Sequence, residues 1–325
     1  MLAAVYYNNS DIRLKEVPKP KIGSGEILVK VLASGICGTD VLEWYRIMKA
    51  PRILGHEIAG EITESKSEGF KVGQRVFVSH HVACGECKYC REGNHTACDT
   101  LHKGNYDPGG YSEFIRVPKM NVDKGTYLLP DNISFEEGTM IEPLACAVRA
   151  QRLIDIKNSH IVLILGSGVS GLLNIQLAKL KGAQVIATDV NDYKLDMARR
   201  FGADQALKAD SDINIKADRI IICTGALKAV EQAFECIDKK GIILFFAIPS
   251  KNVEIPIVDF WRNEITATSS YGAASYDLEE SLKLINDAKI NIKDMITHKL
   301  PLTKIQEGFK IAAAAKESLK VVLIP

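Results

Sequence analysis

A strand, a glycine-rich turn, a helix and a second strand follow one another at residues 160–189. The first strand is HIVLIL and the second is QVIATD, with the helical stretch VSGLLNIQLAKLKG between them. Such a helix lets the two strands lie parallel in one sheet, because it carries the chain back along the sheet. The alternation returns at 218–248, where DRIIICTG and IILFFAI flank the helical stretch ALKAVEQAFECIDKKG. We therefore expect an α/β region with a doubly wound parallel sheet that helices cover on both faces.

The turn between the first strand and its helix has the pattern G-x-G-x-x-G over residues 166–171. Gly166 permits a tight turn, Gly168 lets the backbone approach a pyrophosphate, and Gly171 lets helix and strand pack closely. The helix begins at Val169, and the free N–H groups of its first turn favour phosphates. The turn predicts a dinucleotide site, although a glycine turn in an unrelated α/β domain has the same pattern.

Asp189 ends the second strand, close to the spacing at which this fingerprint has an acidic residue. A carboxylate there accepts hydrogen bonds from ribose hydroxyls and repels a 2′-phosphate, so it favours NAD over NADP. The alternative is a solvated residue at a strand end. Lys194 is a weaker candidate for a ribose contact, and a surface lysine is its ordinary interpretation. NAD is therefore the expected cofactor.

Four cysteines lie within CGECKYCREGNHTAC at residues 84–98, with the spacing C-x2-C-x2-C-x7-C. A disulfide knot, an iron–sulfur site and a zinc site are the competing interpretations. Bacterial ferredoxins place the fourth cysteine after three residues and follow it with proline, whereas Asp99 follows here. In a reducing compartment, clustered cysteines more often bind metal than form disulfides. We predict a closed structural zinc site. Its ligands are Cys84, Cys87, Cys90 and Cys98.

The first 145 or so residues read as short strands broken by glycine and proline, such as EILVKVLASGI, EIAGEI, QRVFV and YSEFIRV. This pattern predicts a β-rich region. It contains ASGICGTDVLEWY at 33–45 and ILGHEIAGEI at 53–62. Taken alone, Cys37 is compatible with a buried thiol and His56 with a hydrogen-bonded core histidine.

The motifs follow a definite order: Cys-Gly-Thr-Asp, Gly-His-Glu, the four-cysteine loop, GGYSEF, Glu-Pro-Leu and the glycine turn. In this order they resemble the zinc-dependent medium-chain alcohol dehydrogenase family, most closely its sorbitol and threonine dehydrogenase branch. The resemblance covers essentially the whole chain. It implies a GroES-like catalytic domain of residues 1–147 and 286–325, and a Rossmann NAD-binding domain of residues 148–285.

The resemblance also implies a second, catalytic zinc, which gives two zinc ions per chain. Cys37 and His56 match its thiolate and imidazole ligands, and Glu57 matches a carboxylate that binds the metal directly or moves in during turnover. Glu142 takes the position of the second cysteine of a Cys2His site and reaches the zinc directly or through its water. Cys146, one helical turn further, is expected to be a packing residue, with a role as a zinc ligand as the alternative.

The implied reaction is hydride transfer from a secondary alcohol to NAD, with zinc lowering the pKa of the alcohol. Thr39 matches a hydroxyl that hydrogen-bonds the substrate oxygen and passes its proton outward. Much of the family continues this route with a histidine where this chain has Leu42. Leucine carries no proton, so Glu43, Glu57 or Glu142 with an ordered water is a candidate replacement. A water chain alone is the other interpretation.

The segment NEITATSSYGA at 263–273 matches the family's last core strand and the turn beyond it. This match implies that Ser270 and Tyr271 lie near the nicotinamide. Relatives are dimers or tetramers, so we expect a homodimer or a homotetramer.

The carboxylate-rich site favours a small-molecule alcohol with neighbouring hydroxyls, such as a polyol, sugar alcohol or cyclitol. L-Threonine and polyol phosphates remain alternatives. Arg46, Lys49 and Arg52 suit a phosphate or a carboxylate, although a solvated loop is their ordinary interpretation. A different class also remains open, namely a zinc-stapled nucleotide-binding protein without dehydrogenase activity.

Length and charge exclude other classes of protein. The 325 residues suggest two domains. Lys and Arg number 41 against 40 Asp and Glu, with no basic stripe, so nucleic acid is not an expected partner. No apolar run is long enough for a membrane span, and the N-terminus lacks an export pattern. We expect a cytoplasmic protein without a membrane partner.

Overall fold

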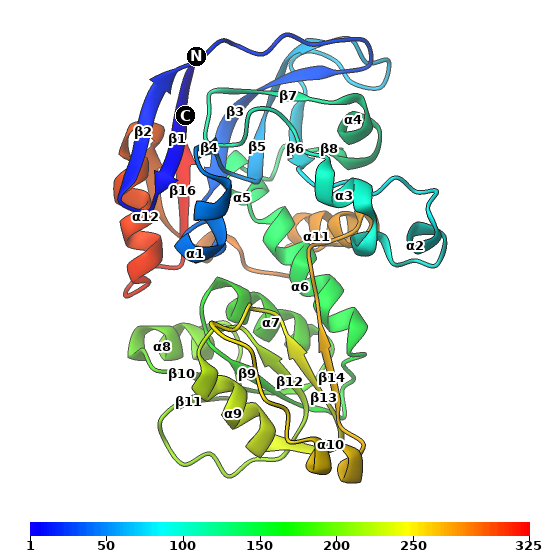
Figure 1. The fold of residues 1–325 in the computed structure, drawn as a ribbon, viewed down its shortest axis with the longest axis vertical. Coiled ribbons are helices and arrows are strands. Elements are labelled where there is room, and N and C mark those ends of the chain that lie inside the picture. The colour runs from blue at the N-terminus through cyan, green and yellow to red at the C-terminus, as the bar shows by residue number, and fades with distance from the viewer. The chain divides into compact units, whose positions relative to one another are not determined.

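The computed structural model describes residues 1–325, which divide into two compact units. Unit 1 consists of Met1–Pro143, Ala273–Asp287 and Ile292–Pro325. Unit 2 consists of Leu144–Gly272 and Ala288–Asn291. Figure 1 labels the helices and strands of both units. None of the helices is both long enough and apolar enough to span a membrane.

Unit 2 is built on six parallel strands in the order β11-β10-β9-β12-β13-β14. The strands are β9 (Ile161–Leu165), β10 (Gln184–Asp189), β11 (Gln205–Lys208), β12 (Ala217–Ile222), β13 (Ile237–Phe245) and β14 (Thr266–Ser269). The central strand β9 is a continuous apolar run, and its neighbour β12 ends in three buried isoleucines, as a sheet covered on both faces requires. The strand order reverses between β9 and β12. At such a switch point the carboxyl ends of the strands leave room for a ligand.

The helices α7 (Val169–Leu180), α8 (Asp192–Arg200), α9 (Leu227–Cys236) and α10 (Ile257–Asn263) belong to unit 2. The division between the units falls within α6 (Ile141–Leu153). The helix predicted over 226–241 is wrong at its C-terminal end. Ile237 already has extended dihedral angles and pairs with Ala217, so the chain enters β13 directly after α9. Pairing with the sheet outweighs the helical propensity of the following lysines.

Unit 1 contains two sheets. A three-stranded sheet has the order β2-β1-β4, and a seven-stranded sheet has the order β15-β16-β3-β5-β6-β8 with β7 paired to β3. The strands are β1 (Leu2–Asn8), β2 (Asp11–Glu16), β3 (Ile27–Gly35), β4 (Arg52–Ile53), β5 (Glu57–Ser65), β6 (Arg75–Ser79), β7 (Phe114–Val117), β8 (Thr126–Leu128), β15 (Ile296–Pro301) and β16 (Lys320–Ile324). The C-terminal strand β16 pairs with β3 through Val322 and Gly35. The end of the chain therefore completes the β-rich unit.

Short helices connect these strands. They are α1 (Glu43–Arg46), η1 (Ile47–Lys49), α2 (Lys88–Arg91), η2 (His95–Ala97), α3 (Asp99–Lys103), α4 (Lys119–Gly125), α5 (Phe135–Gly138), α11 (Ser275–Asn286), η3 (Lys293–Met295), η4 (Leu302–Lys304) and α12 (Ile305–Ala314).

The limits of the two units differ from the predicted domain limits at α11. The prediction ended the nucleotide domain at residue 285, whereas Ala273–Asp287 clusters with unit 1. Hydrogen bonds explain this placement. Ser281 Oγ donates to the Ile141 carbonyl at 2.7 Å, and Ser275 Oγ donates to the Lys124 carbonyl at 3.2 Å. These partners are distant in sequence, so no local pattern reveals them.

Candidate active site and metal sites

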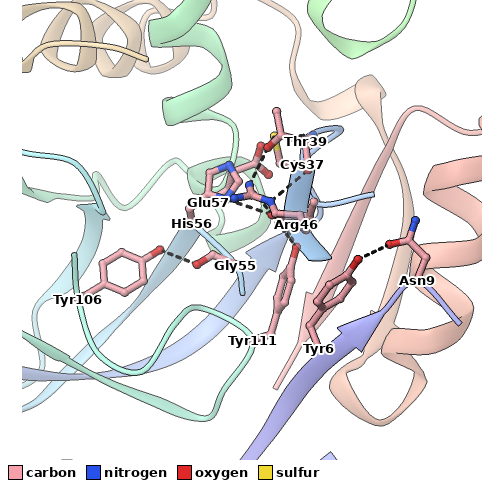
Figure 2. Close-up of polar contacts among 12 residues, drawn as sticks. Tyr6, Asn9, Cys37, Thr39, Arg46, Gly55, His56, Glu57, Tyr106 and Tyr111 are labelled. Atoms are coloured by element: carbon pink, nitrogen blue, oxygen red, sulfur yellow. Dashed lines mark hydrogen bonds and ion pairs between the residues drawn. The ribbon is translucent and has the colours of Figure 1, made fainter. Parts of the chain in front are cut away.

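Cys37, His56 and Glu57 come together in unit 1. Cys37 lies just beyond the end of β3, and His56 and Glu57 lie at the start of β5. The two strands are antiparallel neighbours that pair Gly35 with Glu57, so these ends meet. One ligand atom from each of the three side chains lies within 4.8 Å of the others. Figure 2 shows the three side chains converging. The predicted catalytic donors are therefore adjacent in space.

Asp40 orients the His56 ring. Its carboxylate is fully buried, and Oδ1 lies 3.6 Å from His56 Nδ1. A carboxylate on one ring nitrogen leaves the other nitrogen for a metal. Burial opposes protonation of His56, but the charges of Asp40 and Cys37 outweigh it and raise the pKa of the imidazole to about 10. That proton has to leave before the ring binds a metal.

Asp40 is itself held on two sides. The Tyr111 hydroxyl donates a hydrogen bond to Oδ2 at 2.6 Å, and Arg46 Nη2 lies 2.8 Å from Oδ1. Burial, together with the neighbouring Asp40 charge, raises the pKa of Tyr111 well above its usual value. Tyr111 thus remains a neutral donor. It belongs to the GGYSEF motif, whose role the sequence alone did not reveal.

Thr39 and Arg46 form the next layer of contacts. The Thr39 hydroxyl lies 3.3 Å from Cys37 Sγ and accepts a hydrogen bond from Arg46 Nη2 at 2.9 Å. The Arg46 side chain is only 14% exposed, so the solvated-loop interpretation is wrong for this residue. Glu43, a candidate for the proton route, is exposed and accepts from the Asn9 backbone N–H at 2.8 Å.

Lys320 forms a buried ion pair with Glu57. The two residues are 2% and 1% exposed, and the ammonium contacts Glu57 Oε2. Burial opposes the charged form of Lys320, but Glu57 and Cys37 outweigh it and raise its pKa. Gly35 makes room for the pair, because a Cβ at this position would overlap Glu57 and lie 2.8 Å from Lys320 Cε. The sequence signal for Lys320 was a single charge in an otherwise apolar closing strand.

Replacing Lys320 by methionine is expected to lower the free energy of unfolding by about 3–5 kcal/mol, because Glu57 is left as a buried, uncompensated charge. Adding Glu57→Gln is expected to restore most of this loss, since both charges are then gone. Urea unfolding of the single and double variants measures the difference. Equal instability of the Lys320→Met and the double variant would show that the ion pair has no such role.

Glu142, the second residue of α6, lies close to this cluster. It is 9% exposed, and its charge contributes to the raised pKa values of His56 and Lys320. It is not one of the three donors within 4.8 Å. A direct bond from Glu142 to the metal therefore stays a prediction. Cys146 follows one turn later and belongs to unit 2, outside the same donor group.

Sequence reasoning missed His80 and His81, which follow β6. The His80 ring lies 4.8 Å from the His56 ring and 3.7 Å from the His81 ring, centroid to centroid. Burial and the neighbouring histidines lower the pKa of His80 well below its usual value, and the pKa of His81 to about 3. Asn121 Nδ2 donates to the Ser79 and His80 carbonyls and holds this segment in place. The signal was a histidine pair just before the cysteine loop.

The four cysteines of the loop also converge. One sulfur from each lies within 4.8 Å of the others, and none is in a disulfide. The disulfide interpretation is therefore not supported. Backbone N–H groups point at the sulfurs, from Cys87 to Cys84 Sγ at 3.4 Å and from Cys84 to Cys98 Sγ at 3.4 Å. Four inward sulfurs with N–H donors fit a closed zinc site.

The glycine turn of unit 2 has the geometry that a dinucleotide needs. Gly166 has φ +94°, and a Cβ at Gly171 would overlap the Gly166 carbonyl. A Cβ at Gly168 would meet no protein atom within 4 Å. The positive φ of Gly166 and the close packing at Gly171 therefore explain two of the glycines. No protein contact requires the third, Gly168, which suits a position where a pyrophosphate approaches the backbone. Val169 begins α7, whose first turn offers N–H groups to phosphates.

Asp189 ends β10 and is 9% exposed. Its Oδ2 accepts from the Ser167 N–H at 2.8 Å, and its Oδ1 accepts from the Asn191 N–H at 2.9 Å. These bonds fix the carboxylate beside the glycine turn. Lys194 lies in the first turn of α8. A second cation, Lys208, pairs with Asp192 at 2.8 Å and was missed by the sequence reasoning.

Ser270 and Tyr271 follow β14 in unit 2. Ser270 Oγ is buried and has no hydrogen-bond partner within the protein, whereas the Tyr271 side chain is 46% exposed. A buried hydroxyl without a partner suits contact with a bound ligand. The predicted contact of both residues with the nicotinamide stays a prediction.

The comparisons with known proteins agree with both sets of motifs. Residues 23–130 match the alcohol dehydrogenase GroES-like domain, and residues 170–287 match the zinc-binding dehydrogenase domain. The L-threonine 3-dehydrogenase of Pyrococcus horikoshii is 34% identical, over 96% of this chain and 94% of its own length. The chain belongs to the zinc-dependent medium-chain alcohol dehydrogenase family.

Solved structures of this dehydrogenase family have the same fold. Galactitol-1-phosphate dehydrogenase from Escherichia coli has a TM-score of 0.87 and 26% identity, with 100% of both chains covered. A zinc-binding dehydrogenase from Sinorhizobium meliloti bound to NADP has a TM-score of 0.87 and 26% identity, over 100% of this chain and 99% of the other. The predicted fold, a GroES-like domain with a Rossmann domain, is confirmed. The predicted class, a zinc-containing, NAD-dependent oxidoreductase acting on alcohols, is also confirmed.

Proposed function

We propose that this dehydrogenase oxidises a secondary alcohol with neighbouring hydroxyl groups, such as a sugar alcohol or a cyclitol, and passes the hydride to NAD. The observation that carries the proposal is the donor set of Cys37, His56 and Glu57, whose ligand atoms lie within 4.8 Å of one another. Thiolate, imidazole and carboxylate are zinc ligands. The neighbouring Glu142 adds a carboxylate that accepts hydrogen bonds from extra hydroxyls.

Each residue has a separate task in this proposal. Cys37, His56 and one of the two glutamates, Glu57 or Glu142, hold the catalytic zinc, which when bound supplies a Lewis acid that lowers the pKa of the alcohol. Thr39 hydrogen-bonds the substrate oxygen. Asp40 keeps the His56 ring oriented through Nδ1. The four cysteines of the loop hold a structural zinc and take no part in the reaction.

The cofactor part of the proposal depends on Asp189. Its buried carboxylate beside the glycine turn supports recognition of ribose hydroxyls and disfavours a 2′-phosphate. The Sinorhizobium relative is bound to NADP, so the two cofactors have to be compared directly. Lys194, Ser270 and Tyr271 are the proposed further contacts with the cofactor.

The names of two relatives match the two alternative substrates, L-threonine and a polyol phosphate. The Pyrococcus relative is a threonine dehydrogenase, and the E. coli structure is a dehydrogenase of a sugar-alcohol phosphate. A phosphate or carboxylate needs a free cation. Arg46 is already paired with Asp40, which leaves Lys49 and Arg52 for such a group. We rank an uncharged polyol ahead of both alternatives because the site adds the carboxylates of Glu57 and Glu142, which accept hydrogen bonds from hydroxyls and repel an anion.

A screen of alcohols tests the proposed function. With the purified chain, we expect NAD reduction with at least one polyol or cyclitol, at higher kcat/KM than with L-threonine or polyol phosphates, and slower reduction of NADP. Elemental analysis is expected to give two zinc ions per chain. Prolonged chelation is the control and should abolish the reaction. One zinc per chain with no reaction on any alcohol would instead support the nucleotide-binding protein without dehydrogenase activity.

We also propose that the chain assembles as a homodimer or homotetramer through the β14 edge of unit 2. An edge strand offers unpaired backbone groups to a second copy. Large apolar side chains lie exposed in the segment before β14, including Ile257 at 70% and Trp261 at 78%. Such exposure in a folded protein marks an interaction surface. Sedimentation of the purified chain measures the number of copies.

The cytoplasm is the proposed location. A zinc site of four thiolates is maintained most readily in a reducing compartment, and all eight cysteines are free thiols in the structure.

A further inference from the structure

Arg46 contacts the one hydroxyl that is expected to touch the substrate. It is the last residue of α1, and its side chain is 14% exposed. Nη2 donates to Thr39 Oγ1 at 2.9 Å, and Nε donates to the Thr39 carbonyl at 3.1 Å. Figure 2 shows the guanidinium reaching Thr39 beside Cys37 and His56. Arg46 therefore holds both the backbone and the hydroxyl of Thr39 in place.

The guanidinium is itself held in place. Nη2 lies 2.8 Å from the buried Asp40 Oδ1, and Asp40 is in turn held by the Tyr111 hydroxyl. The Tyr45 ring lies 5.1 Å from the guanidinium carbon, within the range of a cation–π contact. Neighbouring residues therefore hold the Arg46 guanidinium in position to contact Thr39, and this position does not depend on a bound substrate.

The direction of these bonds limits what Thr39 can do. A guanidinium donates hydrogen bonds, accepts none and stays charged. The Thr39 hydroxyl therefore acts as the acceptor towards Arg46, and its single hydrogen has to point elsewhere. The hydroxyl donates this hydrogen to Cys37 Sγ, one of the predicted metal ligands, at 3.3 Å. A hydroxyl passes a proton outward only when it can donate to an acceptor on the outward side. Arg46, the other side chain in contact with this hydroxyl, is a permanent donor and offers no such acceptor.

We propose that Arg46 is a positioning residue that makes the Thr39 hydroxyl a hydrogen-bond donor towards the substrate oxygen, so that Thr39 stabilises the oxygen without passing its proton outward. This inference rests on the proposed function. The proton that the alcohol loses then goes to the Glu142 carboxylate beside the cluster and on to water, so the chain needs no relay histidine where it has Leu42. A donor of fixed direction favours an oxygen without hydrogen, namely the deprotonated alcohol or the carbonyl product, over the neutral alcohol.

Equilibrium binding of acetamide to the holoenzyme with NADH tests the inference without turnover, because the amide oxygen accepts a hydrogen bond and carries no hydrogen. The variants are Thr39→Val, Arg46→Met, their double variant and Arg46→Lys. We expect Thr39→Val and Arg46→Met each to weaken acetamide about tenfold, which corresponds to about 1.4 kcal/mol. The double variant should bind within about twofold of Thr39→Val, because Arg46 acts through Thr39.

Kinetics with an alcohol give a second readout. Arg46→Met is expected to lower kcat about tenfold and to leave KM within about twofold, because the interaction strengthens as the oxygen loses its proton. Arg46→Lys keeps a donor and should remain within about threefold of wild type. Arg116→Met is the matched control, since it removes another partly buried arginine of unit 1 that pairs with Glu26 at 3.0 Å. Zinc content and thermal unfolding monitor the fold of each variant.

Three results would overturn the inference. They are an additive loss of about a hundredfold in the double variant, unchanged acetamide binding in Arg46→Met, and no acetamide binding by the wild type. If Arg46→Met does not fold, Arg46→Lys takes its place in the test. A loss of acetamide affinity in Arg46→Lys that is larger than the loss in Thr39→Val would then overturn the inference. If binding follows the expected pattern and no alcohol is oxidised, the proposed function fails while the assignment of Arg46 stands.

Discussion

Replacing Cys37 by serine is expected to lower the rate of NAD reduction roughly 10⁴-fold, because a Lewis acid supplies several kcal/mol to the reaction and each 1.4 kcal/mol is about a factor of ten. Cys37 offers the thiolate of the donor set that also contains His56 and Glu57. A serine hydroxyl is a poor zinc ligand. The zinc content should fall from two ions per chain to one. Initial rates and elemental analysis of the same preparation measure both effects.

The fold of this variant should survive, which separates a functional loss from a structural one. Cys37 lies in a turn after β3 and is only partly buried, so the substitution removes little packing. The control is Cys236→Ser, a buried thiol of α9 outside both donor clusters. It should keep two zinc ions and nearly full activity. A Cys37→Ser protein with wild-type rates would contradict the assigned metal site.

The glycine turn was predictable from sequence because its physical requirements are local. Gly166 needs a positive φ, and Gly171 needs space beside the Gly166 carbonyl, within six consecutive residues. The four-cysteine loop is predictable for the same reason, since fifteen consecutive residues contain its whole ligand set. Cys37, His56 and Glu57 are further apart, and only the order of the motifs in a resembling family connected them.

The partners of these residues were not predictable, because they depend on tertiary contacts. Lys320 reaches Glu57 from the last strand of the chain. Arg46 looked like part of a solvated loop, yet the buried Asp40 draws its guanidinium inward. The same reason explains the position of α11, whose contacts with Ile141 and Lys124 decide the unit to which it belongs. Residue type gave the chemistry of the site, and long-range packing gave its geometry.

Replacing Cys98 by alanine is expected to remove the other zinc ion and to unfold its loop, whereas Cys37→Ser impairs the reaction and leaves the fold intact. The four cysteines of the loop build a closed site, and the zinc that they bind contributes to folding and not to the reaction. Structural zinc in small peptides contributes about 10–16 kcal/mol at neutral pH, far more than the short helices of this loop contribute alone. The loop at 84–98 should therefore unfold locally, and the zinc content should fall to one.

Limited proteolysis measures this local unfolding. Trypsin cleaves after Lys88 and Arg91, which lie in α2 inside the loop. We expect cleavage there to be at least about tenfold faster in Cys98→Ala than in the wild type, because opening of the loop then costs little free energy. Cys37→Ser is the matched control, since it removes the other zinc and should leave cleavage in the loop slow. Each variant should retain one zinc ion. Loss of NAD reduction in Cys37→Ser and fast cleavage of the loop in Cys98→Ala, at this same zinc content, would show that the two metal sites are distinct. A protease-resistant Cys98→Ala protein with two zinc ions would show that these cysteines do not hold the second metal.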